Sequence, residues 1–177
     1  MSPYLVEIVV HAIKEKYLTE KAFYNDQLGI SPQSWDRWKK GEQGLKYENM
    51  QIISTLFTDY EWMLVQKIVR QAQLSPDFIH NPVAEYIYLK QQIAKTWLQH
   101  DLARIEWKHS QENELGSVRK SNMVILRLVA DYQIWGYSDI IEMRLPGVIQ
   151  NQIGHDQRKL LQWVNDESAK YEEADQI

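Results

Sequence analysis

A short segment near the amino terminus constrains the fold more than any other part of this chain. The segment, residues 18–41, reads LTEKAFYNDQLGISPQSWDRWKKG. Thr19 is a good N-cap residue, and Gly29 suits a turn that requires a left-handed backbone. Ser31 can cap a second helix, and Pro32 fits its first turn, where a missing N–H costs nothing. The segment therefore predicts two short helices joined by a tight turn, the helix-turn-helix arrangement.

The composition is that of an ordinary globular chain. Of the 177 residues, 44% are hydrophobic and 25% are charged, and no apolar run approaches the ~18 residues that a membrane-spanning helix needs. The first residues lack the pattern of a signal peptide. The absence of cysteine excludes disulfides, thiolate nucleophiles and zinc-finger ligand sets, and it suits a reducing compartment. We therefore expect a cytoplasmic protein with no membrane partner.

The overall charge argues mildly against a dedicated nucleic-acid protein, because phosphate contacts require lysine and arginine. The formal net charge is −4 at pH 7. Residues 1–57 hold equal numbers of basic and acidic side chains, so residues 58–177 carry the whole acidic excess. Arg37, Lys39 and Lys40 cluster at the end of the second expected helix. They give a neutral module a small basic edge, sufficient for a grip on phosphate.

Apolar residues recur at helical spacing along the whole chain, and a few glycines and prolines interrupt them. We expect helices over residues 3–17, 20–28, 32–40, 48–57, 61–73, 82–109, 118–135, 138–145 and 155–171, and no strand. The predicted fold class is all-α. An N-terminal four-helix domain with the helix-turn-helix, residues 1–57, precedes a C-terminal helical bundle, residues 58–177.

Residues 18–57 resemble the XRE family, the phage repressor and Cro-like superfamily of helix-turn-helix proteins. The matching residues are Gly29 in the turn, Ile30 behind it, Trp35 six positions after the glycine, and the closing Trp-Lys-Lys-Gly-Glu of residues 38–42. The resemblance is confined to the N-terminal part of the chain. It implies that the second helix of the motif enters the major groove of DNA.

The resemblance also assigns a role to each exposed position of that helix. The groove-facing residues would be Pro32, Gln33, Ser34 and Arg37. The contacts with the DNA backbone would come from Ser31, Lys39 and Lys40. Gln33 can pair bidentately with adenine, and Arg37 can reach guanine or a phosphate. Trp35 and Trp38 lie on the apolar side of the helix, and we expect both in the core.

Three features favour a different class of function, a protein–protein adaptor that keeps the helix-turn-helix shape without binding DNA. Family members usually have a small residue four positions before the turn glycine, where the two helices touch, and this chain has Asn25. An amide left unpaired at a close crossing would cost about 1–3 kcal/mol. Asp36 lies inside the expected recognition helix, where its carboxylate would repel phosphate, and the whole chain is acidic.

No pattern in the sequence predicts an enzyme, a metal site or a cofactor. The histidines lack the spacing of metal ligands, and no glycine-rich phosphate loop or nucleophile motif is present. Apolar stripes in the C-terminal part are typical of a core, and they also suit self-association into a dimer. A third class of function is a small-effector pocket, for which the aromatic candidates are Trp107, Tyr132, Trp135 and Tyr137.

The prediction is therefore a cytoplasmic, sequence-specific DNA-binding protein, a transcriptional regulator that acts as a homodimer. Double-stranded DNA is its expected partner, and a small molecule or a protein is a further candidate as effector. The adaptor is the alternative prediction.

Overall fold

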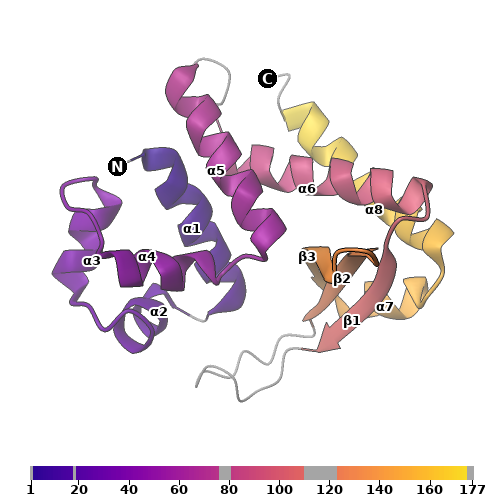
Figure 1. Ribbon diagram of the computed structural model, residues 1–177, viewed down its shortest axis with the longest axis horizontal. Coiled ribbons are helices and arrows are strands. Elements are labelled where there is room, and N and C mark those ends of the chain that lie inside the picture. The colour runs from indigo at the N-terminus through magenta and orange to yellow at the C-terminus, as the bar shows by residue number, and fades with distance from the viewer. Residues whose placement is uncertain (1, 18, 76–80, 110–122, 175–177) are drawn as a thin grey trace. The chain divides into compact units, whose positions relative to one another are not determined.

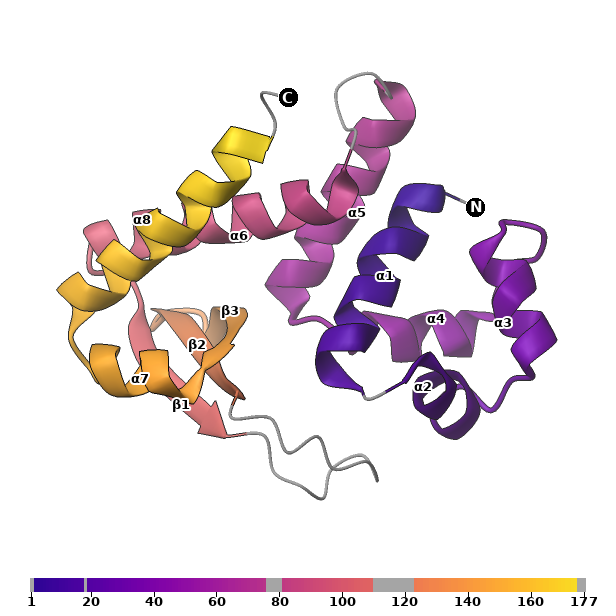
Figure 2. The same ribbon diagram turned by 180° about the vertical axis from the view of Figure 1, so that it is seen from behind.

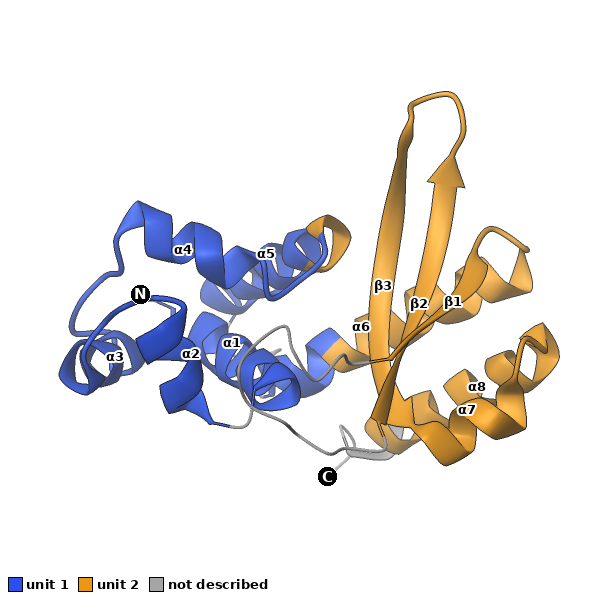
Figure 3. Ribbon diagram, turned by 90° about the horizontal axis from the view of Figure 1, so that it is seen from below, with its two compact units in different colours: residues 1–58, 62–86, 111–120 blue, residues 59–61, 87–110, 121–177 orange. Residues whose placement is uncertain are grey.

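The computed structural model describes residues 2–17, 19–75, 81–109 and 123–174 of the chain. These residues form two compact units, and the chain passes between them within two of its helices (Figure 3). Among the described residues, unit 1 comprises 2–17, 19–58, 62–75 and 81–86, and unit 2 comprises 59–61, 87–109 and 123–174. None of the helices in the described ranges is long and apolar enough to cross a membrane.

Unit 1 is built from short helices (Figures 1 and 2). In chain order they are α1 (Pro3–Lys16), α2 (Glu20–Asp26), α3 (Pro32–Lys39), α4 (Tyr47–Ser54) and the larger part of α5 (Asp59–Leu74). Each lies where the apolar spacing predicts a helix, with ends that differ by a few residues. The carboxyl end of α2 and the start of α3 are separated by the turn that contains Gly29.

Aromatic side chains fill the centre of unit 1. Trp35 and Trp38 of α3 are buried, and their rings stack with centroids 4.7 Å apart. Phe23 of α2 meets both Tyr17 and Trp35 edge-to-face. The prediction that both tryptophans belong to the core is confirmed. Because large aromatic rings dominate buried area, this cluster holds one side of α3 against α2.

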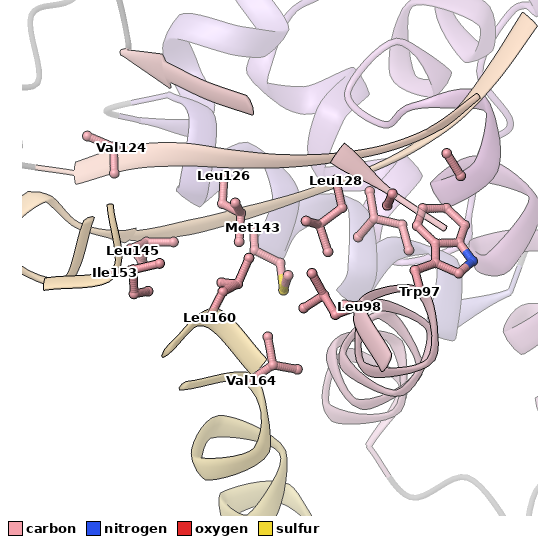
Figure 4. Packing of buried hydrophobic residues seen from close by; sticks show 14 residues of the cluster. Trp97, Leu98, Val124, Leu126, Leu128, Met143, Leu145, Ile153, Leu160 and Val164 are labelled. Carbon is pink, nitrogen blue, oxygen red and sulfur yellow. The ribbon is translucent and has the colours of Figure 1, made fainter. Parts of the chain in front are cut away.

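Unit 2 is an α/β unit with a three-stranded antiparallel sheet. The strands are β1 (Arg104–His109), β2 (Met123–Tyr132) and β3 (Tyr137–Pro146), in the order β1-β2-β3. The helices are the larger part of α6 (Pro82–Gln99), α7 (Gly147–Ile153) and α8 (Gln157–Ala174). A core of aliphatic side chains from β2 and β3 packs against Leu98 of α6 and against Leu160 and Val164 of α8 (Figure 4).

The strand register gives the sheet one apolar and one charged face. Residues opposite each other in an antiparallel pair point to the same face. Leu126 of β2 lies opposite Met143 of β3, and both belong to the core. On the other face, Arg127 reaches Glu106 of β1 at 3.0 Å and Glu142 of β3 at 3.2 Å. These ion pairs connect all three strands.

The all-α prediction for the C-terminal part is wrong. The segments predicted as helices at residues 118–135 and 138–145 contain β2 and β3, and the end of the helix predicted at 82–109 is β1. Residues 118–122 of that prediction lie outside the described residues. Four buried residues of β2 alternate with a period of two, namely Val124, Leu126, Leu128 and Ala130, and Val129 between the last two is buried as well. Ile125 and Val129 are apolar too, so the run is nearly continuous, and periodicity alone does not separate a strand from a buried helix.

A capping motif ends α6 earlier than predicted. The N–H of Leu102 donates to the carbonyl of Trp97 at 2.9 Å, and that of Asp101 donates to Leu98 at 3.4 Å. This is the Schellman pattern, whose left-handed position is usually glycine. Asp101 occupies that position with a φ of 54°. With aspartate in place of glycine, the sequence lacks the usual stop signal, and the chain turns here into β1.

A buried carboxylate occupies the outer edge of β3. Glu61, in the first turn of α5, is 2% exposed. It accepts a hydrogen bond from the backbone N–H of Glu142 at 2.8 Å and pairs with the ammonium of Lys90 at 2.7 Å. Removing one partner of a buried ion pair leaves an uncompensated charge. The carboxylate therefore ties the start of α5 to both α6 and β3 within unit 2.

We expect Lys90→Met to lower the free energy of unfolding by about 3–5 kcal/mol, because Glu61 would stay buried while it loses its ion pair with Lys90. Adding Glu61→Gln should restore most of that loss, since the amide oxygen can still accept from the Glu142 N–H. Urea denaturation followed by circular dichroism measures both variants, with Lys159→Met on the exposed side of α8 as control. A double variant no more stable than Lys90→Met would contradict the pairing.

Replacing Asp101 by glycine should raise the free energy of unfolding by about 1 kcal/mol, because glycine adopts a left-handed backbone without steric cost. The change also removes a negative charge from the carboxyl end of α6, where the helix dipole disfavours it. Asp101→Ala, which keeps a Cβ in that conformation, should not stabilise. Thermal unfolding of the two variants beside wild type tests this. If Asp101→Gly is less stable than wild type, the left-handed backbone at residue 101 is not strained.

Candidate nucleic-acid interface

Side-chain caps start both helices of the α2–turn–α3 segment. The hydroxyl of Thr19 accepts from the backbone N–H of Ala22 at 3.1 Å, and that of Ser31 accepts from Ser34 at 3.2 Å. Pro32 occupies the first turn of α3. Each cap satisfies one of the N–H groups that a helix start leaves without a partner. The capping predicted for both helices is confirmed.

Gly29 makes the turn between α2 and α3. Its φ is 61°, and a Cβ built there would meet no atom within 4 Å. Backbone conformation, and not lack of space, therefore requires glycine. Around it, the N–H groups of Leu28 and Ile30 reach back to the carbonyls of Phe23 and Tyr24. These bonds satisfy the end of α2 and fix the direction in which α3 leaves the turn.

Glu20, at the start of α2, anchors α3. Its carboxylate accepts from the indole N–H of Trp35 at 2.8 Å and from the ammonium of Lys39 at 3.0 Å. Burial raises the pKa of Glu20, but these hydrogen bonds and the charge of Lys39 lower it by more, so the pKa lies below its ordinary value of 4.5. The charged form of Glu20 is therefore favoured in the fold.

Lys39 has two acidic partners. Besides Glu20, its ammonium lies 3.4 Å from the carboxylate of Asp36, one turn earlier on α3. Burial lowers the pKa of Lys39, and the hydrogen bonds to Glu20 and Asp36 raise it by more. The ion pairs hold Lys39 against unit 1 and partly offset the negative charge of Asp36.

The side of α3 away from the tryptophans is exposed. It carries Gln33, Asp36, Arg37 and Lys40, whose spacing of three and four residues places them along one face. Arg37 and Lys40 have no ion-pair partner among the described residues, so their charges are available to a ligand. Hydrogen-bonding and basic groups thus lie together on one exposed helix surface, which we call the α3 face.

The structure divides the predicted DNA-contacting residues into three groups. Gln33, Arg37 and Lys40 lie on the α3 face. Ser31, Pro32 and Ser34 lie at the start of α3, where the two serine side chains serve the cap. Lys39 is held in its ion pairs and is set apart from the others.

Two expectations about neighbouring residues change. Asn25 is exposed and donates to Asp26 at 2.7 Å, so it does not lie unpaired at a close helix crossing. The aromatic residues suggested for an effector pocket do not enclose one. Trp135 and Tyr137 are largely exposed, and the indole N–H of Trp107 donates to the Gly154 carbonyl at 2.8 Å.

Sequence reasoning missed Glu20, whose contacts decide how α3 is held. Its partners Trp35 and Lys39 are 15 and 19 residues away. As the first residue after an N-cap, a glutamate is expected for its effect on the helix dipole alone. The only available signal was the spacing of four between Trp35 and Lys39, which puts both on one side of α3.

Because the pKa of Glu20 is lowered in the fold, its contribution to stability is complete above its ordinary value and is lost as the pH falls through the lower folded value. We therefore expect the difference in unfolding free energy between wild type and Glu20→Gln to shrink as the pH falls from 7 to below 4.5. Urea titrations at several pH values measure it. Glu7→Gln, at an exposed site on α1, controls for the change in net charge. A difference in unfolding free energy between wild type and Glu20→Gln that does not depend on pH would contradict the ion pair of Glu20 with Lys39.

Comparison of the chain with protein-family models, with curated protein sequences and with solved structures gave no significant match. A function for this chain is therefore inferred from its own residues and their geometry.

Proposed function

We propose that the protein binds double-stranded DNA through the α3 face and acts as a sequence-specific transcriptional regulator. The observation that carries the proposal is the arrangement of α3. One side is held by Trp35, Trp38 and Lys39, while Gln33, Arg37 and Lys40 are presented on the exposed side. A helix fixed in this way after a short turn suits insertion into a major groove.

The chemistry of the α3 face fits the edges of base pairs. The amide of Gln33 can donate to and accept from adenine, and the guanidinium of Arg37 can bind guanine bidentately. Lys40, at the end of the helix, can contact a phosphate without reading sequence. The exposed start of α3 at Ser31 offers backbone N–H groups that suit a second phosphate.

The ion pairs of Lys39 bear on the main objection to DNA binding. Asp36 lies on the α3 face and would repel phosphate if its charge were uncompensated. Lys39 lies within ion-pair distance of it and also pairs with Glu20, so with Arg37 and Lys40 these five groups together keep a net positive charge of one. We therefore assign Lys39 to positioning of the helix, and we assign base and phosphate contacts to the other residues.

One observation favours the second candidate function, a protein–protein adaptor. The side chain of Asp36 is 60% exposed, so its remaining surface faces solvent in the middle of the α3 face. A basic partner protein would use this carboxylate, whereas DNA would not. The two functions differ in the effect expected from Asp36→Asn, which should strengthen DNA binding and weaken binding to such a partner.

Dimerisation belongs to the proposal because the basic surface of one copy is small. A protein with few phosphate contacts gains affinity and specificity when two copies bind two half-sites of a palindrome. A low-affinity monomer and a tighter dimer would differ in the slope of affinity against salt, since that slope counts phosphate contacts.

The first test is fluorescence anisotropy against a random duplex pool at ~50 and ~200 mM salt, followed by selection of the bound sequences. With the selected site, Arg37→Ala should lose about 1–3 kcal/mol of discrimination at one base position. Lys40→Ala should weaken binding to all sequences alike and lower the salt slope by about one. Lys67→Ala, an exposed lysine of α5, is the matched control and should bind as wild type does.

Two results would contradict the proposal. No binding at the lower salt would remove DNA as the ligand and favour the adaptor. Binding that is unchanged by both Arg37→Ala and Lys40→Ala would place the DNA contact on another surface.

A further inference from the structure

A cleft of about 570 Å³ lies at one end of the sheet in unit 2. Asp101 lines it from the link between α6 and β1, Asp131 from the end of β2, and His155 from the connection between α7 and α8. We call it the Asp101 cleft. The exposed apolar residues of the hairpin end, Ile134, Trp135 and Tyr137, are not among its lining residues. Its volume falls within the range of small-molecule sites.

Part of the lining is apolar. Val129 is 2% exposed and Ala103 is 9% exposed, so they form the floor of the cleft. Leu102 and Ile105 add further apolar surface beside them. Lysine and arginine side chains bury their methylene stems on such surfaces while the charged end stays in a polar environment. The floor therefore suits a ligand with an aliphatic stem.

The charged part of the lining favours a cation. Arg104 carries the one permanent positive charge among the described lining residues. All three nitrogens of its guanidinium already meet carboxylates, those of Glu106 and Asp131. Asp101, also in the lining, has no ion-pair partner among the described residues. An anion would therefore meet two carboxylates and a guanidinium that is already engaged, whereas a cation would be attracted.

The hydrogen-bonding groups point to the same class of ligand. The side-chain nitrogen of Gln157 donates to the Leu98 carbonyl at 2.6 Å, which leaves the amide oxygen as its acceptor for a ligand. The carboxylates of Asp101 and Asp131 are acceptors too. A primary ammonium group has three N–H donors and no acceptor, so it complements this set. A bare metal ion would make no use of the apolar floor.

We propose that the Asp101 cleft binds a small aliphatic cation, an alkylammonium whose charge lies beside Asp101 and Asp131 and whose stem covers the apolar floor. A free diamine and the lysine side chain of another protein share this chemistry. The cleft belongs to unit 2 alone, so its ligand does not depend on DNA binding by the α3 face.

The test is a titration of the isotope-labelled full chain with cadaverine, followed by the NMR shifts of the backbone amides at ~50 mM salt, where screening is weak. The shifts should be concentrated at residues 101–105, 129–133 and 155–157. We expect a Kd of about 1 mM or below, as suits a ligand with few atoms. The diol of the same chain length, which has the stem without the charge, should bind at least about 10-fold more weakly.

Asp101→Gly is the most informative variant, because it should stabilise the fold while it removes the carboxylate. It should raise the Kd for cadaverine at least about 10-fold, as expected when a charge-assisted hydrogen bond is lost. Unfolding cannot explain a loss of binding in a more stable variant. Asp101→Asn, which keeps the size of the side chain, should weaken binding in the same direction. The matched control is Glu7→Gln, which loses a negative charge at an exposed site on α1 and should bind as wild type does.

A second titration distinguishes the two sources of the cation. Nα-acetyl-lysine methylamide presents the lysine side chain as a protein does. Tighter binding of cadaverine would assign the cleft to a free diamine, and tighter binding of the lysine derivative would assign it to a partner protein. Both results support the proposal.

The proposal is overturned if about 10 mM cadaverine, ten times the expected Kd, causes no shift at the cleft. It is equally overturned if the shifts are centred on other residues, if the diol binds as tightly as cadaverine, or if Asp101→Gly binds like wild type. A loss of affinity in Glu7→Gln as large as that in the Asp101 variants would also overturn it, because binding would then follow net charge alone.

Discussion

The arrangement of α3 depends on the carboxylate of Glu20. Trp35 and Lys39 approach this group from the neighbouring helix, and both bonds are partly shielded from water. Hydrogen bonds to a charged acceptor are stronger and more directional than those between neutral groups. The burial of Trp35 and Trp38 sets which side of α3 faces inward. The carboxylate adds two directional bonds on that same side, so Gln33, Arg37 and Lys40 face outward.

The N-terminal part could be predicted from the sequence because its signals are local. The hydroxyl of Thr19, the left-handed Gly29 and the cap at Ser31 act within a few residues, and the structure places all three as expected. The anchoring role of Glu20 could not be predicted, since it exists only once two helices are packed. The sheet was missed for another reason. Ile125 and Val129 put apolar groups on the charged face of β2, which hid the alternation, and Asp101 replaced the glycine that would have marked the end of α6.

The two faces of the sheet in unit 2, its outer edge and its hairpin end differ in the groups that cover them. One side is packed with aliphatic groups, while Arg127 links Glu106 and Glu142 on the other, an arrangement that antiparallel sheets allow because only one face needs to be buried. The outer edge of β3 has Glu61 as a hydrogen-bond acceptor, so it is less available for pairing with a foreign strand. The hairpin end has no such cover, and the apolar surface is concentrated there.

The position of Glu61 also has a consequence for the order of folding. Its bond to Glu142 joins residues 81 positions apart, whereas the contacts that fix α3 span 15 and 19. Closing a longer loop costs more chain entropy before the contact can form, and pairings between residues far apart in the sequence slow folding. During synthesis, the helices of residues 2–58 can pack as soon as they leave the ribosome. The carboxylate of Glu61 must wait for β3, so the sheet is completed only when most of the chain has been made.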